Sequence, residues 1–324
     1  MRIQENLKKH EQWLETDGKE GKRFVAITSE DELRGANLEE VNLYRADLSK
    51  ANLKGTNLQG ANLEGSNLWQ ANLIGANLSK ANLNGAILLG TNLETSIFVE
   101  ATLQGSNLIK SKLSEAKLNR ADFSEAKLNR ADLSKADLSK ANLSKADLSK
   151  ANLNEAILNH AKLDDAILEG ANLHRARLND AKLQGANLTG ANLKGAILNR
   201  AKLFGANLSF ANLEEAILSF ANLEEAILNE ANLNGANLSF ASLNRANLFD
   251  ADFHGANFFD AHLNRTNLEG AILIGANLEG SDLTGANLSF ASLNDAKLNN
   301  ADLRGAILCL TTMPDGRVDN SGCS

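Results

Sequence analysis

The chain has 324 residues, with 40 Asp or Glu against 33 Lys or Arg, and its formal net charge is −7 at neutral pH. This mildly acidic balance selects no class of partner by itself. No apolar run is long enough to cross a bilayer, and the first residues lack the apolar core of a signal peptide. We therefore expect a cytoplasmic protein without a membrane partner.

Residues 1–17 are predicted to form a short helix that ends at Gly18, whose backbone freedom suits a helix C-terminus. Its more apolar side, at helical spacing, is formed by Ile3, Leu7, His10 and Leu14. Residues 24–27 are apolar and predict a first edge strand. We expect this region to cover the start of the repeats that follow; the alternative is an arm that docks a partner.

The long middle of the chain repeats every five residues. From Leu33 to Leu308 every fifth residue is Leu or Phe, which makes 56 repeats without a slip. The residue two places earlier is usually Ala, and the residue just before is most often Asn or Asp. Neither a helix nor a strand keeps a five-residue step on one side, because the first turns by roughly 100° per residue and the second alternates. The period instead predicts a solenoid in which each repeat is one straight side and a corner.

The tandem units Ala46-Asp47-Leu48-Ser49-Lys50 and Ala51-Asn52-Leu53-Lys54-Gly55 resemble the pentapeptide repeat family. The resemblance extends over residues 33–308. It implies an all-β fold, a right-handed quadrilateral parallel β-helix with four repeats per coil and thus about 14 coils. The expected organisation is an N-terminal helical cap (1–30), the β-helix (31–310) and a C-terminal capping tail (311–324).

Glycine and asparagine predict how the corners are built. Twenty of the 24 Gly occupy the last place of a repeat, which indicates a type II corner with positive φ. Between Lys110 and Asp165 this place never holds Gly, so we predict a different corner there, type I or irregular. The Asn or Asp before each Leu either bonds nearby backbone or forms stacked ladders; the pattern leaves both open.

The stretch from Lys110 to Lys150 is basic. Residues twenty apart are expected on adjacent coils, so like charges form two columns. The candidate anion patch comprises Lys110, Arg130 and Lys150 in one column, and Arg120 and Lys140, followed by His160, in the other. Such a patch favours an anionic partner; the alternative is a solvated face whose own carboxylates neutralise it.

Aromatic residues collect at outward positions between residues 204 and 290. Phe220 and Phe240 are twenty apart and are predicted to stack, with Ile197, Ile217 and Phe259 on the same side. We interpret these five residues as a candidate partner or self-association surface. The alternative is that edge aromatics only shield the corner ladder. Carboxylates greatly outnumber cations in this part of the chain.

After Leu308 the repeat stops. The segment 311–316 predicts a β-turn with Pro314 in its second and Gly316 in its fourth position. The family resemblance implies that such a tail folds over the last coil. Cys309 and Cys323 can pair if their Cα atoms come within ~6 Å. In a reducing cytosol we expect free neighbouring thiols instead. No cluster of ligands for a metal site lies nearby.

The sequence favours a protein without enzymatic activity, cofactor or metal. The five His are scattered, and the Gly residues belong to corners and not to a phosphate-binding loop. The predicted function is a structural or protein-interaction rod that docks an unknown protein through its flat faces and its Phe/Ile strip. The resemblance implies an alternative, a DNA-mimicking modulator of DNA gyrase or topoisomerase. We do not expect direct nucleic-acid binding, because carboxylates interleave the basic face and no aromatics are there for stacking.

Overall fold

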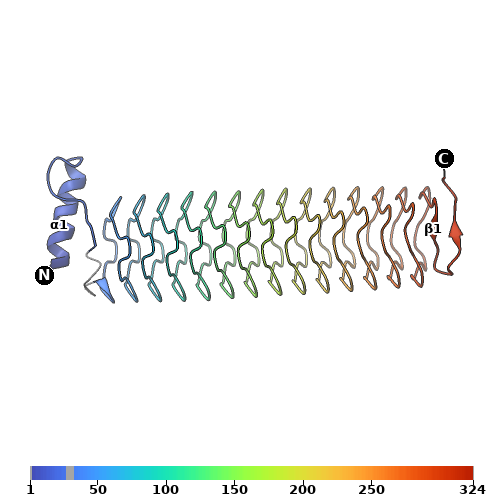
Figure 1. Cartoon of the computed structure of the whole chain (residues 1–324), viewed down its shortest axis with the longest axis horizontal. Helices are drawn as coiled ribbons and strands as arrows, with labels where there is room; N and C mark the ends of the chain where they lie inside the picture. Colours follow the sequence, from blue (N-terminus) through green and yellow to red (C-terminus); the bar gives the residue numbers. More distant parts are fainter. Residues whose placement is uncertain (1, 27–32, 324) are drawn as a thin grey trace. The chain divides into compact units, whose positions relative to one another are not determined.

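The computed structural model describes residues 2–26 and 33–323. It divides into two compact units, unit 1 (Met1–Ile157) and unit 2 (Leu158–Ser324). Residues 27–32 lie outside the described part, and so does the end of the predicted edge strand at Ile27. Each unit is built from stacked coils of the chain (Figure 1).

Regular elements occur at the two chain ends. Helix α1 (Arg2–Glu15) belongs to unit 1, where Figure 1 shows it beside the first coil. In unit 2, strands β1 (Thr311–Thr312) and β2 (Val318–Asp319) form an antiparallel hairpin after the last coil. From residue 36 to residue 310 the chain repeats one pattern, a single bridging residue followed by a two-residue turn.

Parallel backbone pairing joins residues twenty apart, so four repeats complete one coil. In unit 1, for example, the Leu58 N–H donates to the Asn77 carbonyl at 2.7 Å, and the Asn77 N–H donates back to Thr56 at 3.0 Å. Each side contributes only a short extended segment per coil, because a corner follows at once. The sheets are therefore ladders of single bridges and not long strands.

The core is the Leu/Phe column. Every side chain of this column from Leu38 to Leu293 is at most 1% exposed. The Ala two places earlier is buried beside it. Where Thr replaces that Ala, its hydroxyl bonds a backbone carbonyl, as Thr56 does to Leu33 at 2.5 Å and Thr91 to Leu68 at 2.7 Å. Both hydroxyls are thus paired inside the narrow core, which offsets the cost of burying them.

The corners do not change type along the described repeats, so the predicted different corner between Lys110 and Asp165 is wrong. Both residues have φ of 57°, in the range that Gly60 shows with 66°. The turn also closes in the same way with or without Gly, since Ala61 N–H donates to Leu58 at 3.0 Å and Ser111 N–H donates to Leu108 at 3.0 Å. Positive φ at the third residue of the turn is the type II signature. Stacking imposes it even where a side chain costs about 1 kcal/mol or more.

The Asn residues before the Leu column do both things that the sequence left open. The Asn42 carbonyl oxygen accepts the Tyr44 N–H at 3.1 Å, which bonds it to its own repeat. The Asn57 amide donates to Asn37 in the preceding coil at 2.8 Å, which is one step of an Asn ladder. Where Asn occupies this position in successive coils of one unit, the ladder links those coils outside the core.

The predicted N-terminal helix is confirmed by α1. Its Leu7 and His10 are buried, and the His10 Nδ1 accepts the Phe24 N–H at 3.0 Å. The chain leaves the helix through Gly18, whose N–H donates to Trp13 at 2.8 Å. Val25 then forms a parallel bridge with Asp47, so the first part of the predicted edge strand exists.

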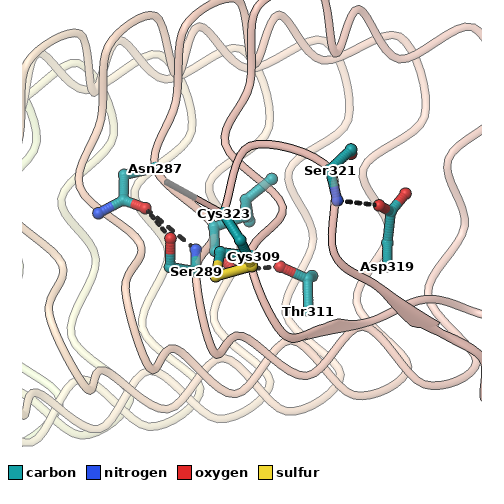
Figure 2. The surroundings of a disulfide bond; sticks show 8 residues. Asn287, Ser289, Cys309, Thr311, Asp319, Ser321 and Cys323 are labelled. Carbon is teal, nitrogen blue, oxygen red and sulfur yellow. Dashed lines mark hydrogen bonds between the residues drawn. A yellow bond between two sulfur atoms is a disulfide. The ribbon is translucent and has the colours of Figure 1, made fainter.

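The predicted turn in the tail is also confirmed. Gly316 N–H donates to Met313 at 2.9 Å, which places Pro314 second and Gly316 fourth in the turn. Cys309 and Cys323 are joined in a disulfide with Cα atoms 4.6 Å apart (Figure 2). The expectation of free thiols is therefore corrected, because the returning tail brings the second Cys within bonding reach of the first.

Candidate interaction surfaces

Three Phe side chains of unit 2 form a continuous aromatic group. The rings of Phe220 and Phe240 are stacked, with centroids 4.8 Å apart and planes 5° apart. Phe259 meets Phe240 edge-on at 5.6 Å. The stack predicted from the spacing of twenty is confirmed. We call these three residues together with Ile197 and Ile217 the Phe strip.

The Phe strip lies on one side of the coils and is partly open to solvent. Ile197 bridges Ile217, so the two aliphatic residues are direct neighbours on adjacent coils. Phe220 is 58% exposed, Phe240 41% and Ile217 37%. Ile197 and Phe259 are half-buried. Exposed apolar side chains in contact across coils form a patch, which is more informative than scattered ones.

A charged residue stands at each end of the Phe220–Phe240 column. Arg200, twenty before Phe220, donates from Nε and Nη2 to the Asp180 carboxylate, both at 2.8 Å. These bonds hold the pKa of Asp180 below its usual value. At the other end, the Asp260 carboxylate lies over Gly280, only 2.1 Å from where a Cβ would be. One end of the column therefore carries Arg200 in its pair with Asp180, and the other end carries the Asp260 carboxylate.

The candidate anion patch of unit 1 is divided by the structure. Lys110, Arg130 and Lys150 are exposed at the fifth position of their repeats, and we call these three the basic ridge. In the second column Arg120 pairs with Glu100 at 3.2 Å, so the charge of Arg120 is compensated and does not add to that of Lys140. His160 belongs to unit 2, where it lies 4.0 Å from Asp180. The basic ridge stays a prediction for an anionic partner.

The flat sides beside the basic ridge alternate in charge. Three bridges join a Lys to an Asp in the next coil: Lys112 to Asp132, Lys117 to Asp137, and Lys127 to Asp147. Burial acts to raise the pKa of Asp147, but bonds from the Ser149 hydroxyl and N–H outweigh it and hold that pKa below its usual value. The Asp therefore stays ionised beside its Lys, and these sides neutralise themselves.

Sequence reasoning missed one column of like charge. Lys162, Lys182 and Lys202 are exposed, bridge one another in unit 2, and have no ion pair within the described part of that unit. Lys182 and Lys202 line a shallow hollow with Phe204. The spacing of twenty that revealed the Phe stack reveals this column as well.

Neither a metal site nor a membrane helix is found in the described residues. Within 2–26 and 33–323, no three His, Cys, Asp or Glu side chains gather closely enough to hold a metal ion. In the same ranges no helix has the length and apolar character to cross a membrane. His10, the one buried His of these ranges, uses its ring within the N-terminal region.

Comparison with known proteins identifies the family. The family model described as Pentapeptide repeats (8 copies) matches in segments that together cover residues 32–313 without a gap. The chain belongs to the pentapeptide repeat family. Members of this family fold as right-handed quadrilateral β-helices, which agrees with four repeats per coil here. No curated protein matches the chain.

Several solved structures of this family are similar to the chain. HetL, a pentapeptide repeat protein involved in heterocyst differentiation regulation from the cyanobacterium Nostoc sp. strain PCC 7120, is 34% identical over 75% of this chain and 91% of its own, with a TM-score of 0.31. QnrB1, a plasmid-mediated fluoroquinolone resistance protein, is 22% identical over 59% of this chain and 86% of its own, with a TM-score of 0.27. Rfr23 from the cyanobacterium Cyanothece 51142 is 31% identical over 40% and 85%, with a TM-score of 0.21.

Proposed function

We propose that the chain is a non-enzymatic interaction protein that docks another protein through the Phe strip. The observation that carries this proposal is the Phe220–Phe240 stack, because both rings are in contact with each other and still largely exposed. Exposed aromatic side chains in a contiguous group are typical anchors of protein interfaces.

The corner geometry supports a docking role over a purely structural one. Phe220 has φ of 61°, and corners that carry Lys140 (61°) or Gly170 (61°) adopt the same value. A corner therefore needs no aromatic residue to form. Phe at the same corner of two successive coils adds apolar surface that the backbone does not require.

The arrangement of reactive side chains supports the absence of catalysis. His160 points its ring toward Asp180, and His10 accepts a backbone N–H, so neither is paired with a nucleophile. The hollow at Lys182 and Lys202 is shallow and open, whereas substrate sites are usually concave enough to bury most of the ligand.

Capture from the native cell tests the proposal. Wild-type protein and the Phe220→Ser/Phe240→Ser variant are immobilised and exposed to the same lysate. We expect a stoichiometric protein partner on the wild type that is lost on the variant. The matched control is Phe204→Ser, which removes an exposed Phe outside the Phe strip (41% exposed) and should leave capture unchanged. Equal capture by all three proteins would show that the Phe strip does not bind the partner.

A second function, DNA mimicry toward gyrase or topoisomerase, has one observation in its favour. Unit 2 exposes carboxylates at the same corner of successive coils, as at Glu230 and Asp250, which are twenty residues apart. Ion pairs interrupt this surface, however, as between Arg245 and Glu225 at 3.0 Å and between Lys194 and Glu214 at 2.9 Å. We rank mimicry second. A supercoiling assay decides, since a mimic must inhibit or protect gyrase at micromolar concentration.

A further inference from the structure

We propose that the Phe strip binds a second copy of this chain, antiparallel, about a two-fold axis that passes midway between the coils of Phe220 and Phe240. The inference rests on the proposed function, because it names the occupant of the same strip. A two-fold interface requires a patch that is complementary to itself when reversed. The Phe strip has this property in its two stacked Phe rings and in the charges at its ends.

The outer coils of the strip match each other on reversal. The two-fold axis sets the coil 196–200 of one copy against the coil 256–260 of the other. Ile197 then lies opposite Asn257 of the second copy, and Phe259 lies opposite Asn199. Arg200 meets Asp260 of the second copy, which pairs opposite charges. Each of these contacts occurs twice in the dimer because of the symmetry.

The inner coils match as well. The coil 216–220 faces the coil 236–240 of the second copy, so Phe220 lies against Phe240 of that copy. The two stacked pairs then face each other as one cluster of four rings, and Ile217 covers the neighbouring position opposite Asn237. Aromatic contacts of this kind add to the stabilisation from burial alone. No like charges are brought together at these four levels.

One edge of the Arg200 guanidinium is available to bind the second copy. Its Nε and Nη2 donate to Asp180, whereas Nη1 forms no hydrogen bond in the described part of unit 2. The side chain is 61% exposed. A guanidinium carries five N–H donors, so it can hold one carboxylate along one edge and bind a second on another.

The parallel arrangement is disfavoured by the same charges. A two-fold axis parallel to the stacking direction of the coils would place Asp260 against Asp260, and these two carboxylates would repel. It would also lose the contact between Arg200 and Asp260. A shifted head-to-tail contact would not close and would lose the match of rings with rings. The charges therefore select one orientation and one register.

The size of the patch sets the expected strength. Four coils at a spacing of about 4.8 Å give a strip under about 20 Å long. A stable interface uses about 800 Å² on each partner. A strip this short gives a weak dimer, so the equilibrium must be followed from low micromolar to near-millimolar concentration.

Charge reversal tests the register by sedimentation equilibrium. We expect the wild type to dimerise in a concentration-dependent manner, and Arg200→Glu or Asp260→Arg alone to weaken dimerisation by about tenfold or more, because each change makes two contacts repulsive. An equimolar mixture of the two variants should associate again. In the mixed dimer the two exchanged charges attract each other across one contact, and the native Arg200 and Asp260 attract across the other. A mixture that stays monomeric, or single variants that dimerise like the wild type, would overturn the inference.

A charge control and the Phe220→Ser/Phe240→Ser variant separate this inference from the proposed function. Lys194→Glu changes charge by the same amount on another side of unit 2, and it should dimerise like the wild type. If it weakens dimerisation as Arg200→Glu does, net charge and not register is responsible, and the inference fails. A wild type that is monomeric at every concentration also ends the inference. The proposed function would still stand if the Phe220→Ser/Phe240→Ser variant loses its captured partner.

Discussion

The first and the last coils of the repeats differ in how completely they are closed. In unit 1, Leu38 is 1% and Leu43 0% exposed, as in the middle of the repeats. In unit 2, Leu298 and Leu303 are only half-buried although they belong to the same column. The central Leu of the repeat is the same at both places. The difference therefore comes from what lies next to the terminal coil.

The flanking segments explain the difference. In unit 1, buried Phe24 adds an apolar residue, and Val25 pairs with the backbone of Asp47. In unit 2, Thr312 bridges Ser292 on one side, and on another the Leu308 N–H donates to Ser321 at 3.0 Å. The other two sides of this last coil have no such backbone partner within residues 33–323. We propose that α1 and residues 24–26 act as a complete cap and that the tail acts as a partial one.

The comparison teaches that closing a solenoid takes two things at once. Apolar cover removes the Leu column from water, and paired backbone removes the open edge. In this proposal, the helix with its following segment supplies both in unit 1. The tail supplies backbone partners for two sides and leaves the terminal Leu residues partly exposed to solvent.

The largest expected effect comes from truncating the column at each end. Leu43→Ala should lower the free energy of unfolding by about 2–5 kcal/mol, the range for a fully buried Leu. Leu303→Ala should cost less than about 2 kcal/mol, because its side chain is already partly in water. Chemical denaturation of both variants measures the two values.

The two substitutions delete the same atoms from the same repeat position, so each serves as the control for the other. Because coils can unfold separately, amide exchange of each unit should accompany the denaturation curves. Equal costs at both positions would show that the ends are closed equally well and would remove the comparison.

The next effect concerns the disulfide. Cys309 and Cys323 are 14 residues apart, and a cross-link over such a loop stabilises by about 3 kcal/mol in the chain-entropy model. In Cys309→Ser/Cys323→Ser, the amide of Leu308 should exchange faster because its bond to Ser321 is lost. Amides near Leu43 should keep their rate. Unchanged exchange at Leu308 would show that the tail is held without the disulfide.

The smallest effect is pH dependence in unit 1. Burial lowers the pKa of His10 below its usual value, and protonation of Nδ1 would break its bond to the Phe24 N–H. Arg23 nearby lowers that pKa further, whereas Glu11 raises it. The unfolded chain then takes up the proton first, so stability falls as the pH drops below about 6.5, by at most about 1.4 kcal/mol per pH unit.

His10→Asn provides the control for this effect. Asn keeps an acceptor of similar size and has no charge to gain over this pH range. Denaturation curves between neutral and mildly acidic pH should converge for the wild type and the variant as the acid removes the advantage of His10. Parallel curves would mean that His10 does not couple the N-terminal region to pH.

The sequence was sufficient for features set by the repeat. The Leu column gave the core, the spacing of twenty gave the Phe220–Phe240 stack, and Pro314 with Gly316 gave the turn in the tail. Each of these depends on local chemistry or on a fixed period, both of which can be read from the residues.

Other features depend on forces that act between coils. The corner at Lys110 was wrongly expected to differ, because residue preference at one position is weaker than the pairing that stacks every corner alike. The Cys309–Cys323 bond depends on the path of the tail, which has no repeat to predict it. The docking role of the Phe strip depends on what binds there, and it stays a proposal.

The most direct test of the account asks whether the Phe strip is separate from the fold. The stability of Phe220→Ser/Phe240→Ser is measured by denaturation beside Leu218→Ala, a buried neighbour that is 0% exposed. We predict a loss of no more than about 1.5 kcal/mol from the ring stack, against about 2–5 kcal/mol for Leu218→Ala, together with loss of binding only in the Phe variant. A loss as large as that of Leu218→Ala, with binding retained, would show that the aromatics serve the fold and contradict the account.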